Sequence, residues 1–542
     1  MGKPIHILLG GIFLLLVFSL LLNLPYMHLR EFQGEEGRRV IIAQHMLETG
    51  EWIVPYVEGR VYLNKPPLFN WALALIFQFT GVISEASARM VSVIAAFLCA
   101  VSLSLFWKNI TGIHSLWFIL PGLIFLTFTD VMDKAIRAEI DMTFTFFVTI
   151  SLISWFYYFE MKKNEYAAWI IALSLISLST LTKGIQAPAF FYCGIIPYLF
   201  YKRRIQKMFS PAHFAGLGIF LFIFAIWFVP LTGKVNLTDV SRAWFREILA
   251  RQEPLKDGGF LGHLIEFPFQ YVLAYLPWMP LLLLWYQKPL EKEPEIMKDL
   301  ARYCLFFLLV SLPIYWILPG ARLRYVMPLS GTLAILLTMP VHAMISGKIE
   351  CGILGNRFFQ ILGLLVTLFV ISSPFWAEQF ALFQKPVSVV LLMLLLFMSF
   401  SLIRKQTAIQ KRIVFLLLVA LLLKVCWASF YFPYHADHRS HYRNAAKRIN
   451  QFVPPDAHLY DFQVNNGHLA FYLGRPVTLI ESLENPVMED GSFVFMEKKK
   501  AQGLVLKGLS LAGTVKARSV TLFLYKIDRG ISKHASRQTC LA

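Results

Sequence analysis

Charged residues are scarce in this chain. They make up 15% of its 542 residues, whereas hydrophobic residues make up 57% and the mean hydropathy is +0.58. A soluble domain cannot bury so much apolar surface, so the composition excludes a water-soluble globular protein. Acidic residues are scarcer than basic ones, 33 against 51, but most basic residues lie in short loops between apolar runs. There they orient a membrane protein and contact anionic headgroups, and nucleic-acid binding is not indicated.

Cysteine is also rare, and its six occurrences include no CxxC spacing, so neither a disulfide framework nor a zinc cluster is implied. No GxGxxG nucleotide fingerprint lies at a strand-to-helix turn, and the internal repeats common in transporters are missing. The apolar run after Lys3 has no small-residue cleavage site behind it. We therefore expect a retained anchor helix rather than a signal peptide.

What the sequence has in abundance is apolar runs of about 20 residues, the length that crosses a membrane. We expect thirteen spans, near residues 5–25, 86–107, 115–132, 141–160, 166–182, 187–201, 213–232, 266–286, 301–318, 325–345, 358–374, 386–403 and 413–432.

The apolar segment 67–81 is the doubtful case, because it is short and opens with two prolines. If it does not cross, the lysine- and arginine-bearing loops fall on one side together with Lys3, which is the positive-inside pattern. We therefore predict a re-entrant or interfacial helix at 67–81. The N-terminus is then cytoplasmic, and the chain from about residue 435 lies on the outer side of the inner membrane.

The last hundred residues are less apolar and predict a small α/β domain over 435–530. The expected elements are 442–452, 458–462, 467–473, 477–480, 493–497 and 520–527. Residues 531–542 are expected to form a disordered tail. The predicted fold class is thus a polytopic α-helical membrane protein, with a transmembrane domain over 1–434 and interfacial helices in an outer loop at 26–85. Three further outer loops, 130–140, 233–265 and 319–324, carry charge beside apolar helices.

An acidic motif follows the first span. Residues 35–38 read Glu-Glu-Gly-Arg. Adjacent side chains point in different directions, so we expect either Glu35 or Glu36 to act in chemistry and the other to hold an arginine, such as Arg38, or a metal ion. A solvated charge cluster at headgroup level is the alternative interpretation.

Lys65 precedes two prolines, which fix the local backbone and favour a helix start at 66 or 67. A compact ammonium at such a rigid corner is a natural partner for a phosphate, and a snorkelling anchor lysine is the alternative. Asp141 opens an apolar helix, where it is either a working carboxylate or an N-cap.

Further cations lie at Lys183 and in the stretch Arg322, Leu323, Arg324, Tyr325, in loops assigned to the outer face. Positive charge normally gathers on the inner side, so these outer cations favour a site for an anionic headgroup.

Two more features invite a functional interpretation. His263 and Glu266 stand three apart and suit one helix face, where they either form hydrogen bonds or bind a metal with a third ligand. Lys424 is a cation inside the last span, where it is functional or snorkels outward.

The motifs in 35–71 resemble the first outer loop of the polyprenyl-phosphate-sugar-dependent glycosyltransferases of the C superfamily. They read Glu-Glu-Gly-Arg, then Glu-Trp-Ile-Val-Pro, then Lys-Pro-Pro-Leu-Phe-Asn-Trp. The family includes the protein O-mannosyltransferases and the bacterial aminoarabinose transferase of lipid A. Later stretches at 181–184, 277–278 and 322–328 resemble further motifs of that family, so the match covers nearly the whole chain.

The resemblance implies roles for five residues. Glu35 falls where the family has its catalytic aspartate, and Glu36 and Arg38 match the following positions. Lys65 and Tyr325 match residues that hold the carrier phosphate.

The resemblance also places Asp141 where a second outer-loop carboxylate is expected. The chain departs from the family at Glu35, one methylene longer than aspartate, at Arg39, which replaces tyrosine, and at Asn64, which replaces the glutamate often found before the lysine. The last departure bears on that family's metal site.

The activity implied is transfer of a sugar from a polyprenyl-phosphate carrier to a lipid, glycan or protein acceptor at the outer face, with inversion. We expect a monomer whose partners are the donor, the acceptor and membrane lipids. The sequence identifies no definite cofactor and leaves a requirement for a divalent metal ion open. A transporter for polyprenyl-linked lipids and an inactive relative acting as an assembly subunit are the alternatives.

Overall fold

A computed structural model describes residues 2–249, 259–376, 386–403, 408–428, 442–464, 467–483, 488–502, 508–517 and 520–528. The expected tail at 531–542 lies outside these ranges. The chain divides into two compact units, each described by itself below. Unit 1 comprises 1–26, 64–69 and 89–430, and unit 2 comprises 27–63, 70–88 and 431–542.

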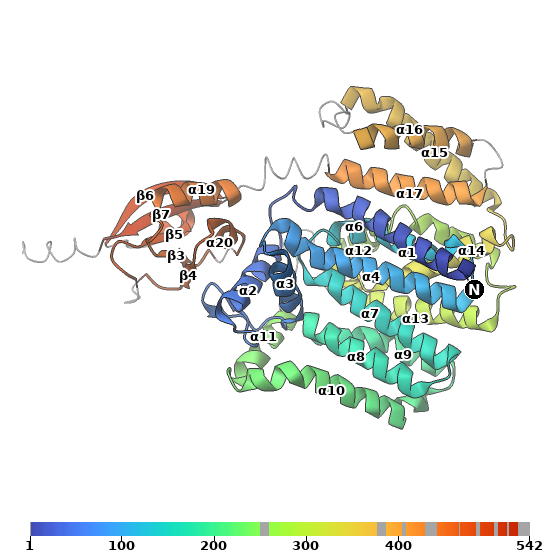
Figure 1. The fold of residues 1–542 in the computed structure, drawn as a ribbon, viewed down its shortest axis with the longest axis horizontal. Helices are drawn as coiled ribbons and strands as arrows, with labels where there is room; N and C mark the ends of the chain where they lie inside the picture. Colours follow the sequence, from blue (N-terminus) through green and yellow to red (C-terminus); the bar gives the residue numbers. More distant parts are fainter. Residues whose placement is uncertain are drawn as a thin grey trace, which may run out of the picture. The chain divides into compact units, whose positions relative to one another are not determined.

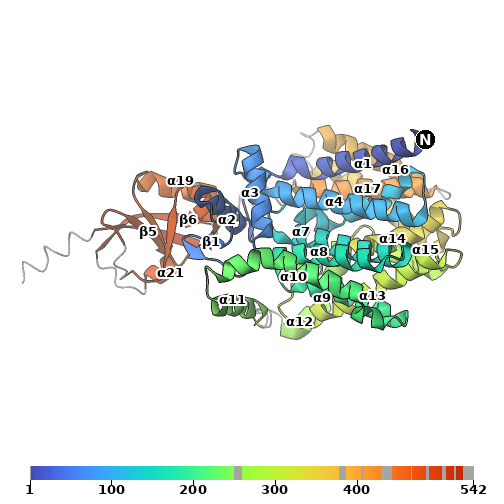
Figure 2. The ribbon, with the colours of Figure 1, turned by 60° about the horizontal axis from the view of Figure 1, so that its bottom comes forward.

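Unit 1 is built from helices, and Figures 1 and 2 show its long helices running side by side. They are α1 (Gly2–Asn23), α4 (Glu85–Thr111), α5 (Leu120–Leu126), α6 (Thr129–Lys134), α7 (Ile140–Phe156), α8 (Glu165–Lys183), α9 (Gln186–Tyr201), α10 (Pro211–Thr232), α11 (Leu237–Leu249), α12 (Gly259–Ala274), α13 (Glu295–Ile317), α14 (Leu329–Ile345), α15 (Gly352–Trp376), α16 (Pro386–Ile403) and α17 (Ile409–Cys426). Short 3₁₀ or π turns join them at Leu24–Tyr26, Leu116–Ile119, Tyr157–Met161, Ile205–Phe209, Met279–Gln287 and Leu323–Tyr325.

The prediction of a polytopic helical membrane protein is confirmed, but the thirteen expected spans differ in length and continuity. Seven helices in the described residues are long and apolar enough to cross a membrane. The pair Gly259–Ala274 and Met279–Gln287, bent by 86°, makes an eighth if it is counted as one span. The segment expected at 115–132 is broken into short pieces, and α9 has only 16 residues.

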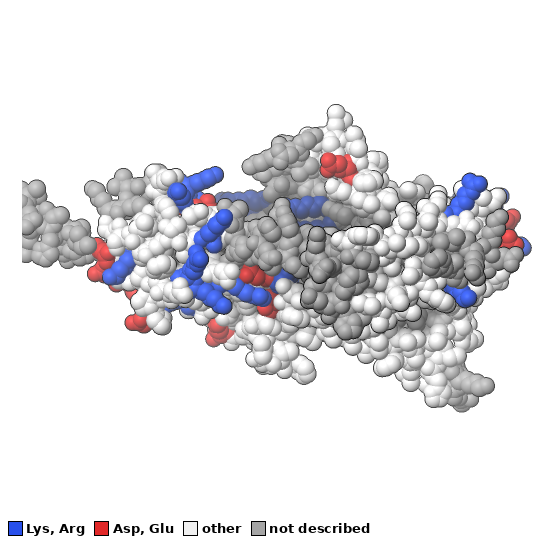
Figure 3. Space-filling model, turned by 90° about the horizontal axis from the view of Figure 1, so that it is seen from above, with Lys and Arg blue, Asp and Glu red and all other residues white. Residues whose placement is uncertain are grey.

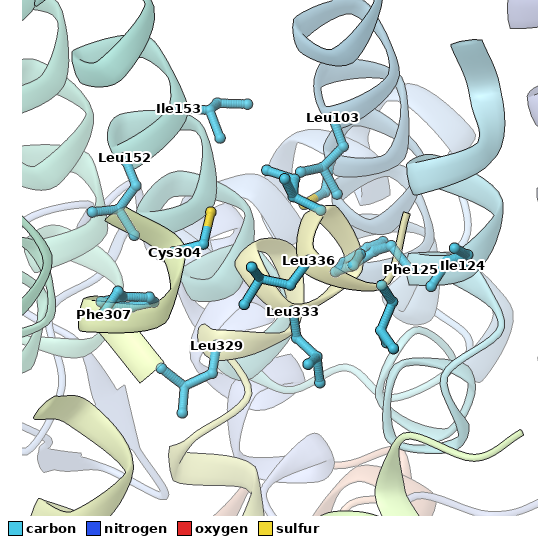
Figure 4. Packing of buried hydrophobic residues seen from close by; sticks show 14 of the residues in the cluster. Leu103, Ile124, Phe125, Leu152, Ile153, Cys304, Phe307, Leu329, Leu333 and Leu336 are labelled. Atoms are coloured by element: carbon cyan, nitrogen blue, oxygen red, sulfur yellow. The ribbon is translucent and has the colours of Figure 1, made fainter. Parts of the chain in front are cut away.

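Helix α14 shows why an apolar run is not always a membrane span. Nearly all of its 17 residues are buried inside the protein. A helix that is apolar all round can be the core of a large protein as well as a lipid-facing span. Figure 4 shows Leu329, Leu333 and Leu336 of this helix packed among side chains of α4, α5, α7 and α13. This core fixes the helix ends that carry the polar residues described below.

The segment 67–81 forms α3 (Leu68–Thr80), with 13 residues. At 1.5 Å per residue it is about 20 Å long, shorter than the roughly 30 Å hydrocarbon core. This length agrees with a re-entrant or interfacial helix, and the place of α3 at the membrane stays a prediction.

The part of unit 2 that precedes α3 contains α2 (Glu36–Thr49) and a hairpin of β1 (Tyr56–Val57) and β2 (Arg60–Val61). Glu58 and Gly59 connect the strands, with φ of 50° and 78°. Two central residues with positive φ are typical of the tight turn that matches strand twist, and glycine suits the second position.

The C-terminal part of unit 2 is the predicted α/β domain. Its five-stranded sheet has the order β4 (Val477–Ile480), β3 (Leu459–Phe462), β5 (Phe493–Glu497), β7 (Val520–Ile527), β6 (Leu509–Ala517). Strand β3 is parallel to β4 and β5, and the remaining pairs are antiparallel. The helices are α19 (Tyr442–Phe452), α20 (Gly467–Leu473) and the short α21 (Lys498–Ala501).

Alternation along the strands gives this sheet two apolar faces. Phe493 and Phe495 pack with α19 and α20, whereas Val494 and Met496 pack on the opposite side. This is the period of two that defines a strand buried on both faces.

The segments 27–63 and 70–88 pack against the C-terminal domain within unit 2. Both carboxylate oxygens of Glu31 accept hydrogen bonds, each 3.0 Å long, from the first backbone N–H groups of α19. The Tyr472 hydroxyl donates to Glu85 at 2.7 Å, and the backbone N–H of Phe32 donates to Tyr472 at 2.9 Å. Helix α2 lies on α20 so closely that a Cβ on Gly37 would be 2.8 Å from the carbonyl oxygen of Gly467. A backbone approach this close requires glycine.

Charge is unevenly distributed over the surface. Figure 3 shows several Lys and Arg side chains close together on one part of a face, whereas other described parts of that face carry none. Lys447 and Arg448 on α19 are both exposed. An uncharged surface is what lipid-facing helices require.

Candidate active site

A pocket of about 240 Å³ lies within unit 1. Four segments far apart in the sequence line it: the turn before α3, the α8–α9 connection, α11 and α13. The lining residues are Asn64, Lys65, Pro66, Lys183, Gly184, Ile185, Gln186, Ala189, Trp244 and Tyr315. The two predicted phosphate-binding lysines, Lys65 and Lys183, therefore line one cavity.

The residues next to each lysine in the sequence fix where its backbone lies. Lys65 is 9% exposed and precedes Pro66, whose ring restricts the backbone before it. Lys183 is the last residue of α8, and Gly184 follows it with φ of 89°. A cation in the last turn of a helix is stabilised by the negative end of the helix dipole. Helix α9 begins at Gln186, so the short connection turns the chain at the pocket.

Lys183 forms a buried ion pair with Asp141. The Lys183 Nζ to Asp141 Oδ1 distance is 2.6 Å, and the two side chains are 3% and 4% exposed. Asp141 lies in the first turn of α7, where the helix dipole favours an anion. The N-cap residue of α7 is Glu139, so the capping interpretation of Asp141 does not describe its position.

Aromatic rings flank this pair. The Lys183 ammonium lies 4.9 Å from the ring centroid of Phe144 and 5.3 Å from that of Tyr325. The Arg324 guanidinium lies 5.7 Å from the Tyr325 ring. Tyr325 is thus beside both cations, within the range of cation–π attraction.

A second buried carboxylate, Glu139, lies next to the pair. It accepts a 2.8 Å hydrogen bond from Lys134, and Arg324 approaches it to 3.7 Å. Burial lowers the pKa of Arg324, but Asp141 and Glu139 outweigh this and leave it above its ordinary value. Arg322, by contrast, is exposed at the start of the turn Leu323–Tyr325. Of these predicted cations, Lys183 and Arg324 belong to one charge network.

In unit 2, Glu35 is the residue immediately before α2 and is 34% exposed. Its carboxylate lies 2.9 Å from Arg38 Nη1 and 3.7 Å from Arg39 Nη2. Glu36 is fully buried, and its Oε2 accepts a hydrogen bond from the backbone N–H of Gln33 at 2.9 Å. The two neighbours therefore differ: Glu35 is partly exposed and pairs with arginines, whereas Glu36 is buried and accepts a backbone hydrogen bond. Which of them acts in chemistry stays a prediction.

Arg38 is held by several groups. Burial lowers the pKa of its guanidinium, but Glu35, Tyr62 and Glu58 raise it above the ordinary value. Its guanidinium lies 5.6 Å from the Tyr62 ring centroid, and that of Arg39 lies 5.3 Å from the same ring.

The family model described as dolichyl-phosphate-mannose-protein mannosyltransferase matches residues 64–228, which include Lys65, Asp141 and Lys183. The crystal structure of ArnT from Cupriavidus metallidurans bound to undecaprenyl phosphate is similar with a TM-score of 0.74 at 17% identity, over 95% of this chain and 98% of that one.

Curated relatives agree. The undecaprenyl phosphate-alpha-4-amino-4-deoxy-L-arabinose arabinosyl transferase 1 of Pseudomonas fluorescens is 25% identical over 385 residues, 68% of this chain and 66% of that protein. The chain is thus similar in sequence to membrane glycosyltransferases that use a polyprenyl-phosphate-linked sugar, and it shares its fold with ArnT. An uncharacterised Aquifex aeolicus protein is 26% identical over 58% of this chain and 60% of its own length. The matches thus span just under two thirds of these two relatives.

Similarity to these glycosyltransferases leaves the roles of the individual site residues as predictions. Glu35 lies in unit 2 and Lys65 in unit 1, so their predicted meeting stays a prediction. The acidic motif lies outside the stretch matched by the family model, whereas the pocket lysines lie inside it.

The predicted metal pair lies on one helix, and its binding of a metal ion stays a prediction. His263 on α12 is buried, and its ring lies 5.1 Å from that of Phe267, whereas Glu266 is exposed. No group of three His, Cys, Asp or Glu side chains suited to a metal ion occurs in the described ranges. Lys424 is 2% exposed and donates a 2.5 Å hydrogen bond to the carbonyl oxygen of Met132, so it does not snorkel outward.

Sequence reasoning missed several residues of these sites. Trp244, Gln186 and Tyr315 line the pocket from three helices, and no spacing relates them to Lys65.

Glu58 was missed as well. It is 7% exposed, and neither of its carboxylate oxygens has a hydrogen-bond partner in the described part of the chain. Burial and the neighbouring Asp461 raise its pKa to about 7, although Arg38 and Arg60 lower it. The Glu-Gly pair signals a turn but not a buried acid.

Proposed function

We propose that the chain is a membrane glycosyltransferase that moves a sugar from a polyprenyl-phosphate carrier to an acceptor at the outer face of the inner membrane. The acceptor is a lipid resembling lipid A, a glycan or a protein. The observation that carries the proposal is the pocket that gathers Lys65 and Lys183 beside the buried Asp141. The family and the similarity to a structure containing undecaprenyl phosphate support the choice of carrier.

The reaction proposed is a displacement with inversion. The acceptor oxygen forms a bond to the anomeric carbon while the bond between that carbon and the phosphate oxygen breaks. The electron pair goes to the phosphate, whose charge changes from one negative to two. Cations that lie ready around the departing oxygen stabilise this new charge more than the starting charge, which lowers the barrier. We assign this role to Lys65 first, with Lys183, Arg324 and Tyr325 beside it.

Acceptor activation depends on the acceptor. A hydroxyl must lose its proton, and Glu35 or Asp141 is proposed to take it. An acceptor phosphate is already ionised, so the carboxylates would then orient it instead. Glu35 is the more accessible of the two, at 34% exposed against 4% for Asp141.

The orientation follows from the basic loops. The N-terminus is proposed to be cytoplasmic and the C-terminal domain to lie outside. The protein is further proposed to act as a monomer. Its partners are the donor, the acceptor and membrane lipids.

The test is a transfer assay. Purified protein is incubated with labelled polyprenyl-phosphate sugar and membrane extract, and the labelled fraction is identified as glycolipid or protein. We expect Lys65→Ala to lower kcat/KM by about 100-fold or more, because a charge-stabilising group is removed. Glu35→Gln should lower it by about 100-fold or more if the acceptor is a hydroxyl.

Matched controls separate chemistry from folding. Lys292→Ala removes an exposed lysine, and Glu48→Gln changes an exposed carboxylate on α2, the helix that Glu35 precedes. Both controls should retain full transfer. Full activity in Lys65→Ala and Glu35→Gln would reject the proposed site, and donor binding or lipid movement without any transfer would favour a transporter or an inactive subunit.

A further inference from the structure

Glu58 is a buried acid in the turn of the β1–β2 hairpin of unit 2. Its side chain is 7% exposed, and neither carboxylate oxygen has a hydrogen-bond partner in the described part of the chain. Burying a carboxyl group without a hydrogen bond costs free energy, so such a group points to a role beyond packing. We infer that Glu58 is a positioning residue: when it loses its proton, it shares the Arg38 guanidinium with Glu35 and so loosens the hold of that arginine on Glu35. The consequence for sugar transfer rests on the proposed function.

The backbone places Glu58 beside the five-stranded sheet of the C-terminal domain. The N–H of Leu479 donates a hydrogen bond to the carbonyl oxygen of Glu58 at 3.4 Å, so the hairpin turn lies against β4. On the neighbouring strand β3, the register partner of Leu479 is Asp461, which is 1% exposed. Glu58, Leu479 and Asp461 therefore follow one another across the sheet edge, and two buried acids lie at the ends of this row.

Helix α2 packs against the same hairpin and brings the acidic motif to it. Val57, the residue before Glu58, is buried in an apolar cluster with side chains of α2. The Arg38 guanidinium of α2 lies 5.6 Å from the ring centroid of Tyr62, which directly follows the hairpin. Its Nη1 atom also lies 2.9 Å from the Glu35 carboxylate. Arg38 thus contacts both the hairpin and the acidic motif.

Three charged groups from the surrounding elements act on the Glu58 carboxyl. Burial and Asp461 of β3 raise its pKa to about 7, whereas Arg38 of α2 and Arg60 of β2 lower it. Arg60 is itself held by an ion pair with Glu481. A carboxyl group with this pKa exchanges its proton between about pH 6 and 8, where an exposed carboxyl group is already ionised. Glu58 can therefore change its charge near neutral pH while Glu35 stays ionised.

The proton on Glu58 decides how Arg38 divides its interactions. A guanidinium group has five N–H donors, so it can bond two carboxylates at once. Once Glu58 is ionised, it competes with Glu35 for these donors, and its charge helps to raise the pKa of Arg38. The Glu35 carboxylate is then less neutralised. A carboxylate with a weaker cationic partner takes up a proton from an acceptor more readily.

The first test examines Arg38 without any transfer. A dicarbonyl reagent modifies guanidine groups in their neutral form, and peptide mass spectrometry of the purified full chain gives the rate at Arg38, whose side chain is 31% exposed. An ionised Glu58 keeps the guanidinium charged, so at about pH 8.5 modification should be at least about threefold slower in the wild type than in Glu58→Gln. At about pH 6 the two rates should be equal. The control Glu48→Gln, at an exposed position on α2, should behave as the wild type.

The second test is the pH profile of transfer. Between about pH 6 and 8.5 the wild-type kcat/KM should rise about tenfold with a midpoint near 7, whereas Glu58→Gln should stay at its low acid-side value. Asp461→Asn removes a charge that raises the Glu58 pKa, so its midpoint should move to lower pH. His468 of α20, whose pKa is lowered by burial, also acts near Arg38 and Glu35. It titrates in the wild type and in Glu58→Gln alike, so the comparison of the two profiles removes its contribution.

The outcomes separate the inference from the function. Equal modification of Arg38 in the wild type and Glu58→Gln at the alkaline end overturns the inference, whether or not transfer occurs. A difference at Arg38 together with identical or falling transfer profiles overturns the positioning role and leaves the enzyme activity standing. A difference at Arg38 with no transfer by any variant supports the action of Glu58 on Arg38 and rejects the enzyme activity.

Discussion

Breaking the Lys183–Asp141 pair should cost more stability than breaking most ion pairs. The two side chains are 3% and 4% exposed and their charged atoms are 2.6 Å apart. Removing one partner of a buried pair leaves the other charge without compensation, and the cost is about 3–5 kcal/mol. We therefore expect Asp141→Asn and Lys183→Met each to destabilise the protein. Lys183→Met should cost less, because Lys134 and Arg324 also stabilise the Asp141 carboxylate.

The double variant provides the sharper test. With both charges gone nothing is left uncompensated, so its stability should return to within about 1 kcal/mol of the wild type. The coupling energy of the double-mutant cycle then has a magnitude of about 3 kcal/mol or more. The assay is denaturant unfolding of the purified chain in detergent, followed by tryptophan fluorescence.

A matched control comes from α13. Arg302 and Glu295 are also 2.6 Å apart, but their side chains are 35% and 63% exposed. Solvent screens such a pair, so its removal should leave the unfolding curve unchanged. Equal, small effects for both pairs would refute the reasoning from burial. Recovery of stability but not of transfer in the double variant would show that the pair has a chemical role besides its structural one.

Three further predictions concern unit 2. The pKa of Glu58 is raised from 4.5 to about 7, so the folded protein keeps a proton on this carboxyl that the unfolded chain releases, and the wild-type stability should fall as the pH rises from about 4.5 to 7. Glu58→Gln should abolish this pH dependence and be more stable than the wild type at pH 8 by up to about 3 kcal/mol. Denaturant unfolding at pH 5 and 8 measures both effects. Gly37→Ala places a Cβ 2.8 Å from the carbonyl oxygen of Gly467 and should lower the stability of this contact by about 1–3 kcal/mol, measured as faster hydrogen exchange in α2 and α20. The control Gly10→Ala, whose Cβ would meet nothing within 4 Å, should leave exchange unchanged. Glu31→Gln weakens the cap of α19 and should speed exchange in its first turn by an amount equivalent to about 1 kcal/mol, and unchanged exchange would contradict the capping role.

The helices and strands predicted best are those that residues close together in the sequence identify. The strands at 477–480, 493–497 and 520–527 and the helix at 467–473 agree with the structure at both ends. Strand β6 (Leu509–Ala517) was missed, because only Val515 and Ala517 of its residues are buried. An edge strand with small residues lacks the alternation that identifies a strand from sequence.

Apolar runs in the sequence predicted helices reliably, but they predicted membrane spans less reliably. Hydropathy reports that a residue avoids water, not whether lipid or protein covers it. Helix α14 is apolar because α4, α5, α7 and α13 surround it, whereas α10 is apolar because it is exposed and must suit lipid. Sequence alone cannot separate these two causes, since the periodicity is the same.

The candidate site shows the same division between local and distant information. Lys65 and Lys183 could be singled out because prolines and helix ends give them unusual backbone settings. Their common pocket, and the bond between Lys183 and Asp141, depend on the packing of α7, α8 and α9 and could not be read from spacing. Sequence analysis therefore assigned the two residues separate roles, with Lys183 binding a phosphate and Asp141 acting as a working carboxylate or an N-cap.

That bond changes how the charges of the pocket should be counted. An ammonium bonded to a buried carboxylate contributes little net charge to a ligand, although its remaining N–H groups can still donate hydrogen bonds. If Lys183 and Asp141 neutralise each other, then Lys65 and Arg324 supply most of the field that a carrier phosphate meets. The pair can then serve the reaction by geometry, since it ties the start of α7 to the end of α8 and so holds the pocket wall in place while the phosphate gains its second negative charge.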